Sequence, residues 1–71
     1  MKERKIYKNA QGRFQVEEDC SYFTSGDSII LKINDEWVNG IVEHDGAGEY
    51  GLMVNGEMVT QLCNGMTVRI D

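Results

Sequence analysis

The only histidine of the 71-residue chain, His44, stands between two acids, Glu43 and Asp45. An imidazole that is oriented by a carboxylate is a common general base. Adjacent residues of a strand point to opposite faces, so neither flanking carboxylate is expected to meet the ring. No Gly-x-Ser-x-Gly nucleophile motif is present, and turn hydrogen bonding accounts for the three serines, Ser21, Ser25 and Ser28. We therefore expect no enzyme activity and no catalytic residue.

Metal and cofactor chemistry has equally little support. Cys20 and Cys63 are the only cysteines, and they stand far apart with no Cys-x-x-Cys pair or clustered histidine. The segment 45–49 holds two acids, whereas a calcium loop needs oxygen ligands at closer spacing. The sequence predicts no metal site and no cofactor.

Aromatic side chains form the more promising set. Four of the six aromatic residues could line a groove for a proline-rich segment or a cage for a cationic side chain: Tyr22, Phe23, Trp37 and Tyr50. Met53, Met58 and Met66 could add an adaptable contact surface. The alternative is that a core this small uses every aromatic and methionine side chain for packing. Of the four aromatics, we expect Trp37 to be partly exposed.

Charge is distributed unevenly along the chain. The net charge is −5, but five basic residues against one acid give residues 1–13 a charge of +4, while residues 14–71 carry −9. An acidic body favours a basic partner and repels a polyanion. A protein partner is therefore the leading expectation. The alternative is contact with nucleic acid through the basic N-terminal arm, in an accessory role.

Short strands must position these residues. Valine and isoleucine outnumber leucine and alanine by 12 to 5, which favours β-structure. Asn34-Asp35 and Asn55-Gly56 are typical of tight hairpins, and Gln61–Gly65 could form one helical turn. The expected strands lie at residues 6–8, 13–16, 28–33, 36–44, 50–54, 57–60 and 66–70. The prediction is an all-β, partly open barrel of five to seven short strands, with one short helical turn before the last strand.

The length of the chain limits its architecture and its chemistry. A chain of 71 residues forms one domain, which buries about 60% of the unfolded surface. We expect a single domain over residues 1–71, with residues 1–5 as a flexible basic arm. The interior of so small a barrel is filled by its own side chains. With no signal peptide or apolar membrane span in the sequence, we expect a cytoplasmic protein, either a monomer or a weak homodimer.

Several segments resemble known proteins. Gly26-Asp27-Ser28-Ile29 and the strand around Trp37-Val38-Asn39-Gly40 resemble the start of an SH3-like barrel. More narrowly, the chain resembles a family of small uncharacterised bacterial proteins, largely from Firmicutes, catalogued as domain of unknown function 5348. The segments that carry this resemblance are Tyr22–Asp27, Glu36–Val38, Ile41–His44 and Gly65–Ile70. It implies a fold and transfers no functional residue. The expected function is that of a non-catalytic interaction module that binds a basic or proline-rich protein segment through its aromatic surface.

Overall fold

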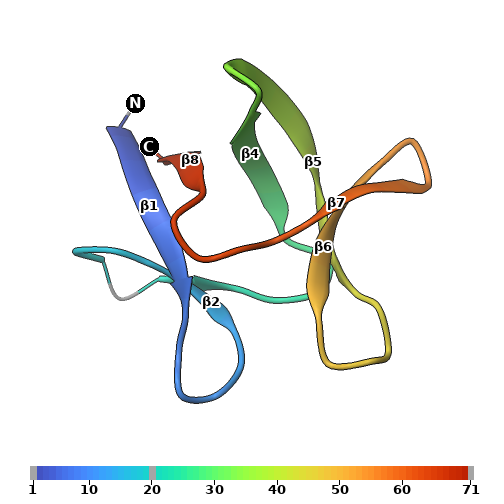
Figure 1. Ribbon diagram of the computed structural model, residues 1–71, viewed down its shortest axis with the longest axis horizontal. Coiled ribbons are helices and arrows are strands. Elements are labelled where there is room, and N and C mark those ends of the chain that lie inside the picture. The colour runs from blue at the N-terminus through green and yellow to red at the C-terminus, as the bar shows by residue number, and fades with distance from the viewer. Residues whose placement is uncertain (1, 20, 71) are drawn as a thin grey trace.

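The computed structural model describes residues 2–19 and 21–70, and it contains eight strands and no helix within them (Figure 1). The strands are β1 (Lys2–Lys8), β2 (Phe14–Val16), β3 (Tyr22–Phe23), β4 (Ser28–Ile33), β5 (Glu36–His44), β6 (Tyr50–Val54), β7 (Glu57–Gln61) and β8 (Thr67–Ile70). They form one antiparallel sheet in the order β3-β2-β1-β8-β4-β5-β6-β7. The sheet curls into a half-barrel, and β3 and β7 are its two ends. The all-β prediction is confirmed.

Two hairpins fix the register of the larger half of the sheet. Asn34 and Asp35 join β4 to β5 with φ of 49° and 67°, and Asn55 and Gly56 join β6 to β7 with φ of 53° and 82°. Positive φ at both central residues gives a turn whose twist matches the strands. Both hairpin predictions are confirmed.

Nine side chains form the core inside the curl: Ile6, Phe14, Val16, Ile29, Leu31, Val42, Leu52, Leu62 and Val68. Eight of them lie on β1, β2, β4, β5, β6 and β8, where the inward face of each strand points into the core, and Leu62 follows β7. No polar side chain of the described residues is buried. The interior is therefore apolar and is filled by the chain itself.

Two sequence predictions about the elements need correction. The strand count is eight rather than five to seven, because Tyr22–Phe23 pairs with β2 as a short strand of its own. The helical turn at Gln61–Gly65 is absent: β7 continues to Gln61, and a turn follows in which the Met66 N–H donates to the Cys63 carbonyl at 3.3 Å. A helical turn does not form there, because backbone groups of this segment are hydrogen-bonded to β1 instead. The Gly65 N–H donates to the Ile6 carbonyl at 2.8 Å, and the Ile6 N–H donates to the Met66 carbonyl at 2.9 Å.

The N-terminal segment also differs from the flexible arm that we expected over residues 1–5. Met1 lies outside the described residues, whereas Lys2 to Lys5 belong to β1 and pair with β8 from Ile70 back to Thr67. On its other side β8 is the neighbour of β4, which in turn pairs with β5. The basic segment is therefore part of the sheet.

Candidate functional site

The four predicted aromatic residues occupy separate parts of the sheet. Phe23 and Tyr50 are half-buried and pack against the core. Tyr22 is 51% exposed on β3, beside Arg13, whose guanidinium carbon lies 5.7 Å from the ring centroid. Trp37 is half-buried near the start of β5.

Distance along β5 keeps two of these aromatics apart. Tyr50 pairs with His44, seven residues beyond Trp37 on the same strand. At about 3.3 Å per residue, this places the two about 23 Å apart along the strand. Tyr22 lies on β3, separated from β5 by four strands in the sheet order, and the hollow that it lines contains none of the other three aromatics. The four side chains therefore do not line one groove.

Cations of the chain itself already cover the Trp37 ring. The guanidinium carbon of Arg69 lies 4.1 Å from the ring centroid, and Lys32 Nζ lies 5.8 Å from it. The register places Lys32 directly opposite Trp37 on β4. Because the π face attracts these two cations, a partner's lysine or arginine would have to displace them.

The structure brings a different set of side chains together on the outer face of β4–β7. Ile41 pairs with Met53, and Met53 pairs with Met58, so these three side chains stand in one row across three strands. Ile30, on the next row of β4, faces the same side. We call these four residues the apolar stripe. Ile41 is 38% exposed and Met58 is 42% exposed, although most outward positions of a half-barrel carry polar side chains.

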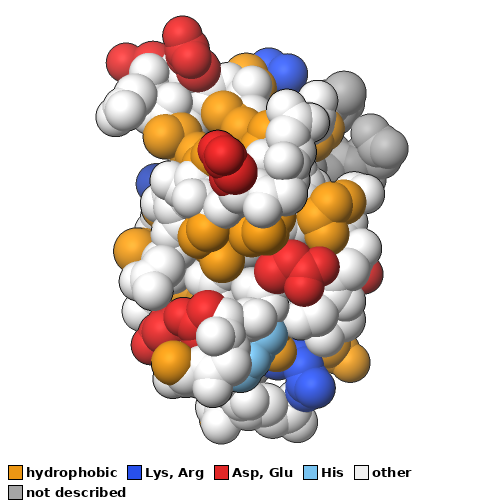
Figure 2. All heavy atoms as spheres, turned by 90° about the vertical axis from the view of Figure 1, so that its right-hand side faces the viewer, with side chains coloured by type: hydrophobic (Ala, Val, Ile, Leu, Met, Phe, Trp, Pro, Cys, Tyr) orange, Lys and Arg blue, Asp and Glu red, His pale blue; other side chains and the backbone are white. Residues whose placement is uncertain are grey.

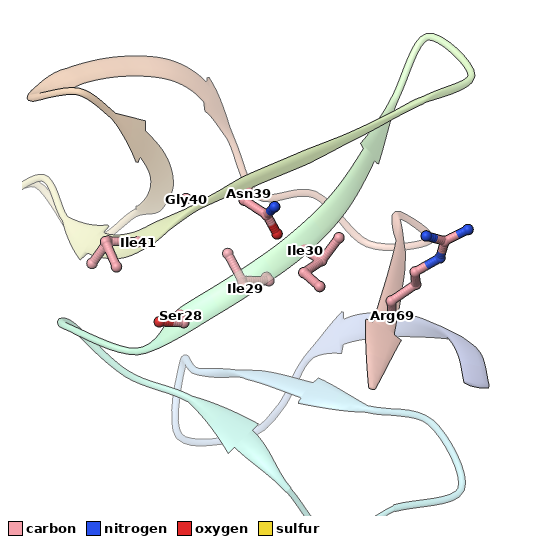
Figure 3. Close-up of a pocket in the computed structure, with 7 residues that line it drawn as sticks. All are labelled: Ser28, Ile29, Ile30, Asn39, Gly40, Ile41 and Arg69. Carbon is pink, nitrogen blue, oxygen red and sulfur yellow. The ribbon is translucent and has the colours of Figure 1, made fainter. Parts of the chain in front are cut away.

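Two shallow hollows lie along the apolar stripe, and both are lined by Ile41. The first contains Ile30, Asn39 and Arg69, which project from three adjacent strands in Figure 3. The second contains Met53 and Met58. Figure 2 shows hydrophobic side chains exposed across this side of the molecule, between groups of acidic ones. The stripe is thus a continuous contact surface.

A glycine shapes the second hollow. Gly51 pairs with Glu43 and Gln61, so it occupies an outer-face position of β6. The thioether of Met58 lies directly over Gly51, in the space that a β-carbon would need. The flexible Met58 side chain can lie flat across the sheet only because this position has no side chain.

Acidic residues border the second hollow. Glu43 and Asp45 line it together with His44, and none of its lining residues is a lysine or arginine. Glu57 is the first residue of β7, after the Asn55-Gly56 turn. This end of the apolar stripe is therefore negative, whereas its opposite end carries Lys32 and Arg69.

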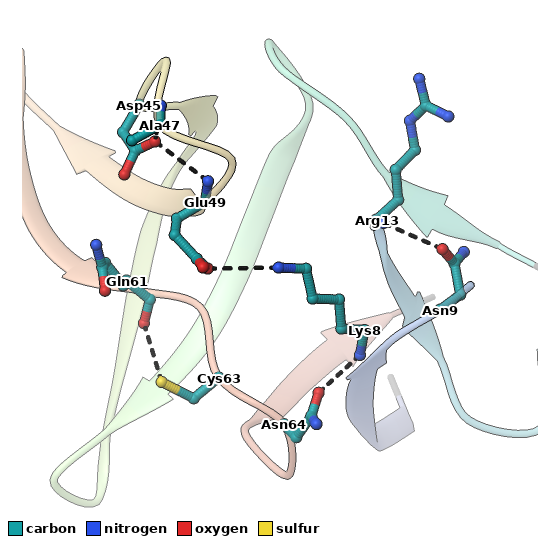
Figure 4. Close-up of polar contacts among 9 residues, drawn as sticks. All are labelled: Lys8, Asn9, Arg13, Asp45, Ala47, Glu49, Gln61, Cys63 and Asn64. Atoms are coloured by element: carbon teal, nitrogen blue, oxygen red, sulfur yellow. Dashed lines mark hydrogen bonds and ion pairs between the residues drawn. The ribbon is translucent and has the colours of Figure 1, made fainter. Parts of the chain in front are cut away.

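Asp45 also builds the loop beside the hollow. Its Oδ1 accepts hydrogen bonds from the N–H groups of Ala47 at 2.7 Å and Glu49 at 3.2 Å, and these two bonds hold the pKa of the Asp45 carboxyl below its usual range (Figure 4). The Glu49 carboxylate then pairs with Lys8 Nζ at 3.6 Å. The loop is thereby joined to β1, on the other side of the curled sheet.

Several basic residues of β1 and of the turn before β2 have partners within the chain. Arg4 pairs with Glu18 at 3.6 Å, and the Lys8 N–H donates to Asn64 Oδ1 at 2.7 Å besides the side-chain pair with Glu49. Arg13 lies beside Tyr22. The two ion pairs, Arg4–Glu18 and Lys8–Glu49, reduce the positive charge that this segment presents to an outside polyanion.

Other candidate groups show structural roles. His44 is exposed: its Nδ1 accepts the Gly46 N–H at 3.2 Å, and its ring packs edge-on against Tyr50 at 4.8 Å. Cys63 is exposed, and Cys20 lies outside the described residues. Residues 2–19 and 21–70 contain no cluster of three or more metal-ligating side chains and no helix that could cross a membrane.

Comparison with known proteins gives one match. The sequence model of the family described as Domain of unknown function (DUF5348) matches residues 4–70. The chain belongs to the DUF5348 family. No curated protein and no solved structure matches it at a significant level. The matched DUF5348 residues run from within β1 to the end of β8 and include the apolar stripe, and the family description assigns no activity to them.

Part of the apolar stripe is predictable from the sequence of this DUF5348 chain. Trp37, Asn39, Ile41 and Glu43 share one face of a strand by simple alternation, and we considered Met53 and Met58 as an adaptable surface. The hairpin at Asn55-Gly56 fixes β7 beside β6, which places Met58 beside Met53. What the sequence did not show is that Ile30 and Ile41 lie on the same outer face.

Proposed function

We propose that this chain is a non-catalytic interaction module of the SH3-like type, which binds a basic segment of another protein over the apolar stripe. The observation that carries the proposal is the exposed row Ile41–Met53–Met58, bordered by Glu43 and Asp45. Apolar contacts supply affinity, while unpaired carboxylates favour a partner with lysine or arginine and repel an acidic one. Exposed methionines suit such a surface, because their side chains adapt to different shapes.

We propose that binding takes place on the outer surface of the half-barrel. Nine side chains fill the interior, so a partner meets only the outside of the sheet. A proline-rich partner would need several aromatic rings in one groove, and the four aromatics are dispersed. We therefore propose an extended basic segment rather than a proline-rich one, within a cytoplasmic setting.

Titration with a defined peptide tests the proposal. The probe is Lys-Val-Lys-Val-Lys-Val-Lys, and its control is the same peptide with glutamate in place of lysine. We expect the methyl signals of Ile41, Met53 and Met58 to shift with the lysine peptide only, and binding to weaken as salt rises. Binding of both peptides with equal affinity would contradict the proposed basic preference.

Two variants with the same change of charge locate the binding site. Ile41→Lys places a cation in the apolar stripe, whereas Tyr22→Lys places one on β3, at a side chain that is also well exposed. We expect Ile41→Lys to abolish peptide binding and Tyr22→Lys to leave it within twofold of the unmodified chain. The opposite result would move the site to the aromatic residues.

A further inference from the structure

The outer edge of β7 is the free end of the larger half of the sheet. β6 is its only neighbour in the sheet order of the described strands. Its side chains include Val59, 51% exposed, and Met58, 42% exposed. The other end of the sheet is β3, which has only two residues and offers little length for pairing.

Backbone groups on this edge point away from β6. The Leu62 N–H donates to the Tyr50 carbonyl at 2.8 Å, so Leu62 directs its backbone groups toward β6. Since these groups alternate along a strand, the neighbouring Gln61 directs its N–H and C=O outward. The Gln61 carbonyl accepts hydrogen bonds from two side chains of its own segment, Thr60 Oγ1 at 3.2 Å and Cys63 Sγ at 3.8 Å (Figure 4).

Few of the usual protective devices guard this edge. Free edges of stable sheets commonly carry lysine or proline, which oppose pairing with another chain. β7 has the sequence Glu-Met-Val-Thr-Gln and contains neither. It does contain one irregularity, because the register with β6 skips Val59. The two residues of β7 that follow this bulge, Thr60 and Gln61, pair regularly with β6.

The negative charge near β7 favours a basic partner at this edge. Glu57 begins β7, and Glu43 and Asp45 line the hollow on the face beside it. No residue of β7 is basic. A second copy of the chain would bring the same acids to the edge, whereas a basic segment would complement them.

We propose that β7 accepts an extended basic segment of a partner protein as an added antiparallel or parallel strand, through backbone hydrogen bonds to the edge around Gln61. Side chains of that segment on the outer face then lie beside the Met58 end of the apolar stripe, and a lysine or arginine of the segment pairs with Glu57 on β7. The inference rests on the proposed function and adds the mode of binding.

Backbone methylation separates this mode from simple contact with the face. The parent probe is Lys-Val-Lys-Val-Lys-Val-Lys; one derivative carries N-methyl groups on the backbone amides of its three valines, and another carries them on the backbone amides of the three lysines that follow the first. Residues that alternate along a strand direct their N–H groups to opposite edges. We expect one derivative to bind about 10-fold to 100-fold more weakly than the parent and the other to bind within about threefold of it.

A pair of variants tests the same edge from the side of the protein. Gln61→Pro removes an outward N–H without removing a bond to β6, and Gln61→Ala keeps that N–H. We expect the parent peptide to lose at least tenfold in affinity for Gln61→Pro and less than twofold for Gln61→Ala, with thermal melting used to show that both variants are folded. In the unmodified chain, peptide binding should slow hydrogen exchange at the Gln61 amide.

The outcomes distinguish the two proposals. If both methylated peptides bind as well as the parent, the strand addition is wrong while the basic docking surface stands. If the parent itself does not bind, the proposed function fails and the strand addition fails with it. If light scattering shows that the chain alone is a dimer that Val59→Lys dissociates, a second copy occupies the edge and the inference is overturned. The peptide experiment decides the question even if Gln61→Pro does not fold.

Discussion

Gly40 lies on β5 close to Leu52 and Met53 of β6. A β-carbon at this position would lie 2.5 Å from Leu52 Cδ1 and 2.6 Å from the carbonyl oxygen of Met53. Leu52 is fully buried and cannot swing away without opening the core. The carbonyl belongs to the β6 backbone, so it moves only if the strand moves.

The cost of Gly40→Ala follows from these contacts. Overpacking of a well-packed core by one methyl group costs about 1–3 kcal/mol, and a rigid backbone atom favours the upper part of that range. Replacing a strand glycine with alanine returns about 0.5–1 kcal/mol in backbone entropy. The net loss is about 2 kcal/mol, against a total stability of about 3.5–10 kcal/mol for a chain of this length. It corresponds to a fall of about 8–16 °C in Tm.

Thermal and urea unfolding, followed by circular dichroism, measure this loss. Gly51→Ala is the matched control, because a β-carbon there meets chiefly the flexible end of Met58, with the Thr60 carbonyl oxygen at 2.9 Å. We expect Gly51→Ala to cost less, about 1 kcal/mol, and Met58→Ala to relieve part of that cost in the double variant. No removal of a side chain would relieve Gly40→Ala in full, because the Met53 carbonyl remains.

A small effect at Gly40 would refute this reasoning. If Gly40→Ala melts within about 2 °C of the unmodified chain, β5 and β6 are not packed as closely as described. If Gly51→Ala proves the more harmful of the two, the order of rigidity between the two sites is wrong. The second of these results would also require revision of the shape assigned to the second hollow.

Three further predictions concern the core, the tryptophan and the 45–49 loop. Leu31→Ala removes a fully buried side chain and should cost about 2–5 kcal/mol in urea unfolding. Arg69→Ala uncovers the Trp37 ring, so its fluorescence emission should move to longer wavelength while the melting temperature changes little. The pKa of Asp45 is lower in the folded than in the unfolded chain, so its contribution to stability is present above pH of about 4 and is lost as pH falls through the folded pKa. The Ala47 amide signal should shift in that acidic range, and Asp45→Ala should abolish the shift.

Local signals made much of the fold predictable. Alternation along the chain placed Ile6, Phe14 and Val16 on one face, and all three are buried in the core. The tight turns at Asn34-Asp35 and Asn55-Gly56 follow from residues that accept positive φ. Each of these features depends on residues close together in the sequence.

Long-range pairing explains what the sequence did not reveal. β3 forms because Phe23 pairs with Phe14 of β2. Its two residues are too few to show a periodic pattern in the sequence. The segment before Leu62 continues β7 instead of forming a helical turn, because the backbone groups of Gly65 and Met66 are hydrogen-bonded to β1. A contact between segments about 60 residues apart leaves no local pattern in either of them.

The site was visible in part for the same reason. Exposure of Ile41 follows from its alternation with the buried Val42. Convergence of the aromatic side chains required knowledge of which strands are neighbours, and the sheet order separates Tyr22 from Trp37 by four strands. The apolar stripe likewise arises from register, which joins Ile41 to Met53 and Met53 to Met58.

The pairing of β1 with β8 has a consequence for how the chain folds as it is synthesised. β1 is made early, but its partner β8 follows after about 60 further residues, or about 3–12 s at ordinary translation rates. During that interval the hairpins β4–β5 and β6–β7 can form from local contacts, while one edge of β1 waits unpaired. A nascent chain that stalls before Thr67 therefore holds two completed hairpins and a sheet split through its middle, a state exposed to chaperones and to proteases.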